Sequence, residues 1–174
     1  GKSMVWVISN SGLFKVKYLD QKFEIHKVTI PSFRSSASSQ IFQDRILSSF
    51  IFQTKTGNVY YGNNGELFCI QNNKVERIKT DQILAVNAGM ELYNGSLLFG
   101  TNKGLFKLEK DCLEPLNDLH TIKIDVRNIN TDGKKIWLLG KELVGEKIET
   151  NLYAIDLNNS EYFRKIGKSN GLID

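Results

Sequence analysis

Side chains that could act as nucleophiles or bind a metal are few in this sequence of 174 residues. The two cysteines, Cys69 and Cys112, stand far apart, and no CxxC pair is present. We expect both to be buried free thiols; a disulfide between them is the alternative. The two histidines, His26 and His120, belong to no metal-ligand spacing and are predicted to lie on the surface or in loops. The sequence therefore indicates no metal site and no cofactor.

Motifs of catalysis and nucleotide binding are absent from the sequence as well. It contains no GxxxxGK(S/T), no GxSxG and no GxGxxG. The segment DLNNSE (156–161) carries oxygen-bearing side chains at alternate positions, but it lacks the glycine and the terminal glutamate of a calcium loop. A hairpin turn explains it better. We predict that the chain itself is not an enzyme.

Two pairs of an acidic and a basic residue are the best candidates for binding a ligand. Asp44 and Arg45 immediately precede one predicted strand, and Asp125 and Arg127 lie at the start of another. A carboxylate accepts hydrogen bonds and a guanidinium donates them, so such pairs could hold a polar ligand such as a sugar. The alternative is that the charges neutralise one another between neighbouring parts of the fold.

The elements that must position these residues repeat along the chain. The similar phrases are GSLLFGTNKGLFKL (95–108), GNVYYGNNGELFCI (57–70), MVWVISNSGLFKVK (4–17) and a diverged copy that begins DGKKIWLLG (132–140). Gly57, Gly95 and Gly133 are separated by 38 residues in both steps, from 57 to 95 and from 95 to 133. A constant spacing of this size indicates a repeat protein.

Each repeat can be divided into four predicted strands. In the third copy these are the segments 83–92, 96–100, 104–109 and 112–116, which are rich in Leu, Val, Ile, Phe and Tyr. Asn94-Gly95 and Asp132-Gly133 predict tight primed turns between the first and second strands. No segment keeps a helical apolar period over three turns, so helices are not expected.

Four antiparallel strands repeated every ~40 residues are typical of a β-propeller. The predicted fold is therefore all-β, with about four four-stranded blades that form an arc of a larger ring. The predicted blades cover residues 1–30, 41–80, 81–118 and 119–174. Large side chains recur at fixed places and are predicted to fill the core between sheets. These columns are Trp6, Tyr60, Leu98 and Trp137; Leu13, Leu67 and Leu105; and Phe14, Phe68 and Phe106.

The repeats resemble the short propeller repeat in the sensor region of bacterial hybrid two-component regulators. The matching residues are Asp132-Gly133 with Trp137, GTNKGL (100–105) and Gly171-Leu172. The sequence departs from the pattern at four places: Tyr60 and Leu98 replace the tryptophan, Glu66 replaces the middle glycine, and Leu139 stands where a small residue is expected.

This resemblance implies a location and a role. It implies a periplasmic or extracellular sensor segment that binds a ligand, in many members an oligosaccharide, and passes the signal to a histidine kinase elsewhere in the parent chain. The expected partners are that ligand and neighbouring blades of the same parent chain or of a second copy. Two other interpretations stay open, namely a protein-interaction propeller and a fragment of a propeller enzyme that processes polysaccharides.

Composition limits the other partners. The formal net charge is +4, but the 23 basic and 19 acidic residues are interspersed without a run of Lys and Arg, so no nucleic-acid partner is expected. No apolar run approaches the ~20 residues of a membrane span, so no direct membrane contact is expected in this segment. A serine-rich stretch at 31–40 is predicted to be a connector, and the insertion KELVGEKIET (141–150) is predicted to project from one face.

Overall fold

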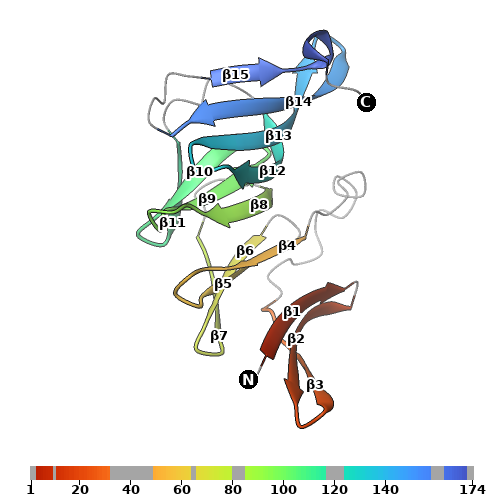
Figure 1. The fold of residues 1–174 in the computed structure, drawn as a ribbon, viewed down its shortest axis with the longest axis vertical. Coiled ribbons are helices and arrows are strands. Elements are labelled where there is room, and N and C mark those ends of the chain that lie inside the picture. Colours follow the sequence, from red (N-terminus) through yellow and green to blue (C-terminus); the bar gives the residue numbers. More distant parts are fainter. Residues whose placement is uncertain are drawn as a thin grey trace.

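The described part of the chain folds almost entirely into short antiparallel strands (Figure 1). The computed structural model describes residues 3–9, 11–31, 49–63, 66–79, 85–116, 124–157 and 163–171. Within these ranges the only helical element is the 3₁₀ turn η2 (Lys168–Asn170). None of the helices found there is long and apolar enough to cross a membrane. The serine-rich stretch beyond Pro31 lies outside the described residues.

The strands form four separate sheets, each built from consecutive strands, which we call blades 1 to 4. Blade 1 consists of β1 (Ser3–Ser9), β2 (Gly12–Leu19) and β3 (Lys22–Lys27). Blade 2 consists of β4 (Phe50–Gln53), β5 (Val59–Asn63), β6 (Glu66–Gln71) and β7 (Lys74–Arg77). Blade 3 consists of β8 (Val86–Glu91), β9 (Leu97–Thr101), β10 (Gly104–Glu109) and β11 (Cys112–Pro115). Blade 4 consists of β12 (Asp125–Thr131), β13 (Lys135–Val144), β14 (Lys147–Asp156) and β15 (Phe163–Ile166).

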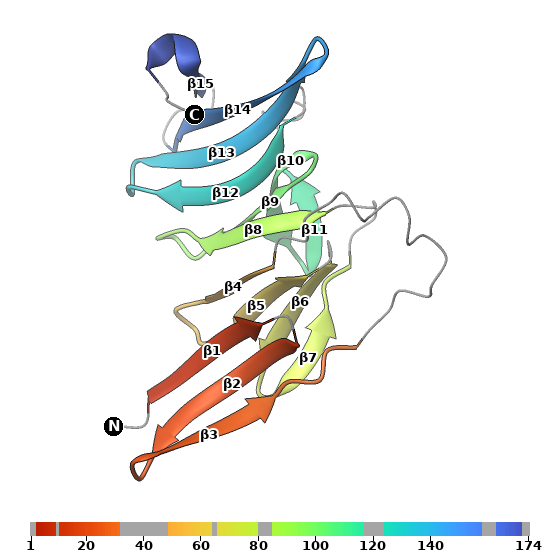
Figure 2. The ribbon, with the colours of Figure 1, turned by 90° about the vertical axis from the view of Figure 1, so that its right-hand side faces the viewer.

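The blades are stacked in the order of the sequence (Figure 2). Every strand pairs antiparallel with the next strand of its own blade. Hydrophobic clusters join blade 1 to blade 2, blade 2 to blade 3, and blade 3 to blade 4. The predicted all-β fold of propeller blades is confirmed.

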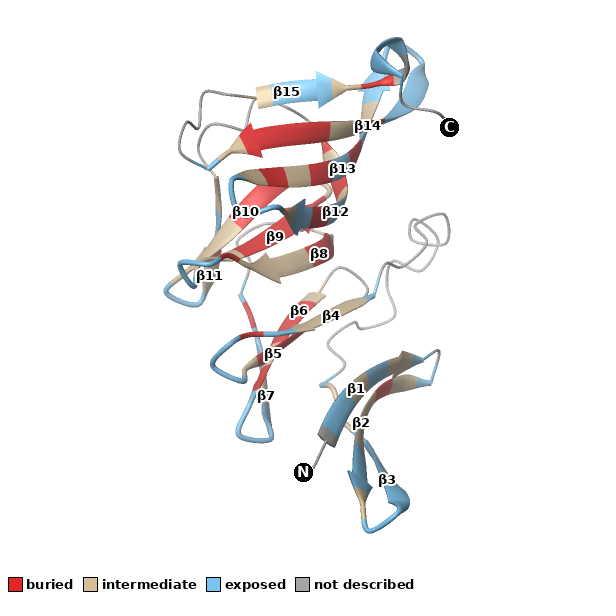
Figure 3. Ribbon diagram, viewed as in Figure 1, coloured by how far each residue is buried: buried red, intermediate tan, exposed pale blue. Residues whose placement is uncertain are grey.

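The second and third repeats each contain an adjacent Leu-Phe pair whose side chains pack in two different interfaces. Leu105 belongs to the cluster shared with blade 4, and Phe106 belongs to the cluster shared with blade 2. In the preceding repeat, Leu67 faces blade 3 and Phe68 faces blade 1. Successive residues of a strand point to opposite faces of the sheet, so two neighbouring apolar residues can attach a blade to both of its neighbours. The core of this chain is therefore the set of spaces between blades (Figure 3).

The tryptophan column has one register in blades 2, 3 and 4, since Tyr60 pairs with Cys69, Leu98 with Lys107 and Trp137 with Ala154. Tyr60 and Leu98 are buried in the clusters shared with the following blade. Ile136 and Leu138 pack in the cluster shared with blade 3, so Trp137, between them in the strand, lies on the opposite face of blade 4 and is partly exposed. The predicted place of Trp137 in the repeat is therefore correct, but among the described residues no blade covers that face.

The tight turns also differ from the prediction. Gly95 and Gly133 have φ values of 83° and 89°, but the preceding residues do not have positive φ. The amide of Gly95 donates to Leu92 O at 3.0 Å, and the amide of Leu92 donates to Ser96 O at 2.8 Å. This is a three-residue loop with glycine in the left-handed region, not a primed two-residue turn. Primed turns, with positive φ at both residues, occur instead between later strands, at Asp20-Gln21, Asn72-Asn73 and Lys110-Asp111.

The insertion in the fourth repeat extends a hairpin. Strands β13 and β14 pair continuously from Lys135↔Asp156 to Val144↔Lys147, around a turn that contains Gly145. The ribbon extends past the other strands of blade 4 (Figure 2).

Candidate ligand-binding sites

The first strands of blades 2, 3 and 4 lie next to one another, since β8 contacts both β4 and β12. Two of them carry an irregularity near their start. The register of β8 shifts between Val86 and Ala88, and that of β12 shifts between Val126 and Asn128. A bulge turns one side chain away from the regular alternation of the strand. This is the region where Asp125 and Arg127 were predicted to bind a ligand.

The side chains of Asn87, Asp125 and Arg127 form one hydrogen-bonded cluster. Asn87 is 7 % exposed, and its Nδ2 donates to Asp125 Oδ1 at 2.9 Å and to the carbonyl of Val126 at 2.9 Å. The other carboxylate oxygen of Asp125 accepts a bond from Nη2 of Arg127 at 2.5 Å. Both carboxylate oxygens of Asp125 thus accept hydrogen bonds, one from a neighbouring blade and one from the same strand.

The structure brings Asp125 and Arg127 together but pairs their charges within one strand, whereas the sequence suggested pairing between blades. Asp44 and Arg45 lie outside the described residues. Asn87 was missed, although it precedes Asp125 by one repeat length of 38 residues. Comparing Asp125 with the equivalent position of the preceding repeat would therefore have identified Asn87 as a candidate site residue.

This inner-strand cluster has groups that can bind a polar ligand. Among the described residues it contains one carboxylate, that of Asp125, whereas most glycoside hydrolases use two. Nε of Arg127 is buried and has no hydrogen-bond partner in the described part of the chain, so the guanidinium is only partly satisfied. Within the same part of the chain, no three His, Cys, Asp or Glu side chains form a possible metal site.

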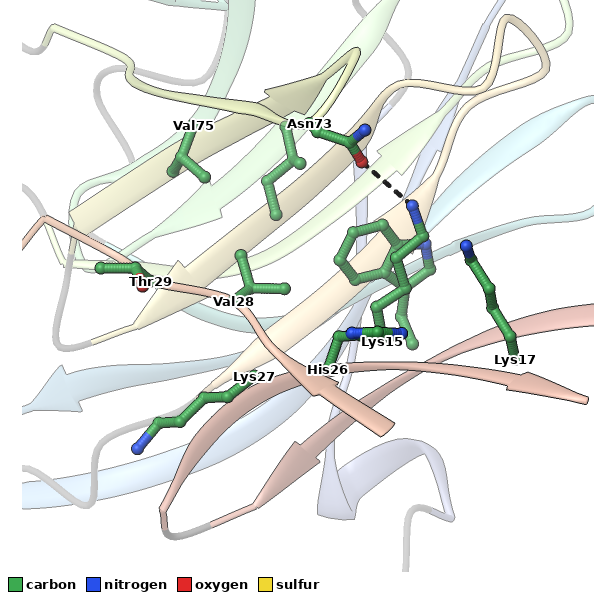
Figure 4. A pocket seen from close by; sticks show the side chains of 10 residues that line it. Lys15, Lys17, His26, Lys27, Val28, Thr29, Asn73 and Val75 are labelled. Carbon is green, nitrogen blue, oxygen red and sulfur yellow. Dashed lines mark hydrogen bonds between the residues drawn. The ribbon is translucent and has the colours of Figure 1, made fainter. Parts of the chain in front are cut away.

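A second candidate is a groove of about 440 Å³ between blades 1 and 2 (Figure 4). Pockets of this size accommodate small ligands. Its walls combine apolar and basic side chains from both blades. The lining residues are Trp6, Lys15, Lys17, His26, Lys27, Val28, Thr29, Ile70, Asn73 and Val75.

Lys15 connects the two sides of the groove. Its Nζ donates to Asn73 Oδ1 at 3.1 Å and lies 5.7 Å from the centre of the Trp6 ring, within the range of a cation–π contact. The ammonium groups of Lys15 and Lys17 point to the same end of the groove in Figure 4. Lys27 points away from them, and its Nζ lies 6.0 Å from the centre of the Phe14 ring.

The sequence contained a signal for this groove. In the strand FKVKY (14–18), Lys15 and Lys17 alternate with apolar residues, which places both lysines on one face. His26 was predicted to be a surface residue, and its side chain is 59 % exposed. What the sequence could not show is which residues of blade 2 lie opposite.

Comparison with solved structures relates these features to known folds. Two crystal structures of the extracellular domain of BT4673 from B. thetaiotaomicron, described as a one-component and as a hybrid two-component system, match at TM-scores of 0.52. The sequence identities are 17 % and 13 %, over 78 % and 93 % of this chain and 20 % and 28 % of those chains. YCF48 bound to D1 peptide matches with a TM-score of 0.55 and 11 % identity, over 94 % of this chain and 50 % of that chain.

The fold is that of β-propeller blades. The propeller segment spans at most half the length of these solved structures. A hybrid two-component system is among the proteins with this fold, in agreement with the resemblance seen in the repeats. No protein-family model matches the chain, and no curated protein matches it.

The thiols of the propeller segment are not part of either candidate site. Cys69 and Cys112 are both free, as predicted, but each is partly exposed rather than buried. Desolvation raises the pKa of the Cys69 thiol above its ordinary value, with Glu76 and Asp111 adding to the effect and a hydrogen bond with Tyr60 opposing it. A thiol with a raised pKa stays protonated at neutral pH and is a weak nucleophile.

Proposed function

We propose that this chain is a non-catalytic segment of a periplasmic or extracellular sensor propeller that binds an oligosaccharide. In its parent chain it would pass the binding signal to a histidine kinase. The observation that carries the proposal is the groove between blades 1 and 2, in a fold shared with the extracellular domain of a hybrid two-component system.

The groove has the chemistry that saccharide binding requires. A sugar presents apolar C–H faces and a rim of hydroxyl groups, so its site needs an apolar surface with hydrogen-bonding groups around it. Trp6 and Ile70 supply apolar surface, and Asn73 and Lys15 supply polar atoms. The inner-strand cluster of Asp125, Arg127 and Asn87 supplies further polar groups, and it stays a predicted second contact region for a ligand.

Calorimetric titration of the purified chain with a panel of neutral and charged oligosaccharides tests this proposal. We expect at least one saccharide to bind with a saturable heat, and none to be cleaved. Cleavage would appear as new reducing ends after prolonged incubation. A response that stays flat for every saccharide would reject the sensor proposal, and release of reducing ends would favour the enzyme alternative.

A second candidate function is protein binding. Blade 1 exposes several large apolar side chains on the face that points away from blade 2, among them Val5 (57 %), Phe23 (72 %) and Ile25 (65 %). Exposed apolar patches of this kind often mark interaction surfaces. A flat glycan panel together with saturable binding of a purified protein or peptide would favour this function.

A further inference from the structure

We infer that the groove between blades 1 and 2 selects anionic saccharides, carboxylated or sulfated, and that Lys15 and Lys17 bind their acidic groups. This inference rests on the proposed function and names the ligand class and the residues that select it. The juxtaposition that supports it is two ammonium groups beside an apolar floor, in a groove without an acidic lining residue.

The charge of the groove is positive because of how β2 is patterned. Lys15 and Lys17 lie on the face of the strand that looks toward blade 2, and none of the ten lining residues is Asp or Glu. The hydrogen-bond partner of Lys15 is the neutral amide oxygen of Asn73, so its charge is not neutralised. Lys17 makes no ion pair with any residue that the structure describes. Two neighbouring ammonium groups, neither of them in an ion pair within the described residues, attract an anion.

One carboxylate, that of Glu24, lies near the groove and lowers its positive potential. Glu24 stands opposite Lys17 in the pairing of β2 with β3. Its Oε2 lies 3.6 Å from Nε2 of His26, and both side chains are about half exposed. Glu24 therefore reduces the positive potential at the rim but is directed to the imidazole. Removing its charge should strengthen the binding of an anion.

The floor of the groove explains why a saccharide fits better than a bare inorganic anion. Trp6, Val28, Ile70 and Val75 form apolar surface beside the lysines. An inorganic anion would make no use of this surface, whereas a sugar ring can bury its C–H face there while its carboxylate or sulfate reaches the ammonium groups.

The test compares ligands that differ only in charge. The chain is titrated with tetragalacturonate, with its fully methyl-esterified form, and with a sulfated tetrasaccharide. We expect tetragalacturonate or the sulfated sugar to bind at least about tenfold more tightly than the ester, with an affinity that falls as NaCl is raised. Equal binding of the acid and the ester would overturn this inference and leave the sensor proposal standing. No binding of any saccharide would reject both.

Substitutions then locate the site. The double variant K15Q/K17Q should weaken the binding of the anionic sugar by at least about fivefold, as expected for the loss of two charge-assisted contacts. The matched control K134Q/K147Q removes the same charge from exposed positions in blade 4 and should leave the affinity unchanged. K15R/K17R should restore most of the binding. An unchanged affinity in K15Q/K17Q would overturn the assignment.

Two further measurements separate binding from folding. E24Q should bind the anionic sugar more tightly. A general loss of structure would instead weaken the binding, so the two effects can be told apart. In the W137F variant, Trp6 is the sole tryptophan of the chain, so its fluorescence reports on the groove. Saturable change of this fluorescence by the anionic sugar is expected, and a titration that releases heat without altering Trp6 fluorescence would contradict the site. Circular dichroism of each variant confirms that it is folded.

Discussion

The indole Nε1 of Trp137 donates a hydrogen bond to Oδ2 of Asp132 at 3.0 Å, which ties the start of β13 to the turn before it. The other carboxylate oxygen of Asp132 accepts bonds from the amides of Lys134 at 2.8 Å and Lys135 at 2.7 Å. Trp137 therefore stabilises a turn, not the core between blades. The conspicuous Asp-Gly and Trp of the fourth repeat form one local structural unit.

The ionisation of Asp132 should make the turn sensitive to acid. Hydrogen bonds from the amides of Lys135 and Lys134, and then from Trp137, hold the pKa of Asp132 below its ordinary value. A carboxylate whose pKa is lowered by folding stabilises the folded state above its unfolded-state pKa of about 3.9. That contribution is lost as the pH falls through the lower pKa of the folded state.

The D132N variant tests this relationship. We expect a lower melting temperature than that of the unmodified chain at pH 7, because the carboxylate charge and the acceptor for the indole are lost. The difference should shrink as the pH is lowered from about 4 to 2.5, where the native carboxyl also becomes neutral. Thermal unfolding followed by circular dichroism measures both chains. A difference that stays constant over this range would show that the charge plays no part.

Leu138, not Trp137, should be the residue of β13 that stabilises the contact with blade 3. Leu138 is 1 % exposed and belongs to the cluster between blades 3 and 4. The L138A variant should lower the free energy of unfolding by about 2–5 kcal/mol, the usual cost of truncating a buried leucine. The control L139A, at a site 39 % exposed, should cost less than about 1 kcal/mol. Urea denaturation measures both, and equal costs would show that the burial of Leu138 against blade 3 adds no stability.

Asn87 should contribute to stability through its two hydrogen bonds to blade 4. In the N87A variant, Asp125 Oδ1 and the carbonyl of Val126 each lose the hydrogen bond that Nδ2 of Asn87 donates to them. Leaving such groups without a partner costs about 1–3 kcal/mol, so a loss of this size is expected in urea denaturation. N128A, which changes an exposed asparagine of the same strand, is the matched control and should alter stability by less than about 0.5 kcal/mol. If the two variants were equally stable, the bonds of Asn87 would contribute nothing measurable.

Arg127 distinguishes the inner-strand cluster from the groove as a place for ligands. If a saccharide binds at the inner strands, R127Q should reduce its affinity while K15Q/K17Q leaves it unchanged. The guanidinium and the carboxylate of Asp125 are each about one-third exposed, so the ion pair itself should contribute no more than about 1 kcal/mol to stability. Titration of both variants with the same saccharide panel measures the difference. If R127Q bound every saccharide as tightly as the unmodified chain, Arg127 would act only in the ion pair with Asp125.

The sequence by itself was enough to predict the repeat, the all-β fold and the position of the turns. These properties are local: strand propensity depends on nearby Leu, Val and Phe residues, and a glycine such as Gly95 marks a turn because its φ is positive. The alternation in FKVKY (14–18) likewise placed Lys15 and Lys17 on one face without any knowledge of the partner blade.

Only the tertiary structure decided which residues meet across blades. In β13, Leu138 packs against blade 3 while Trp137 lies on the opposite face, and only the stacking of the sheets shows which of the two faces is covered. Asn87 reaches Asp125 from another blade, and Lys15 reaches Asn73 across 58 residues of sequence. Such contacts depend on how whole sheets stack, because the register and rotation of each sheet are determined by packing between sheets and not by the residues of one strand.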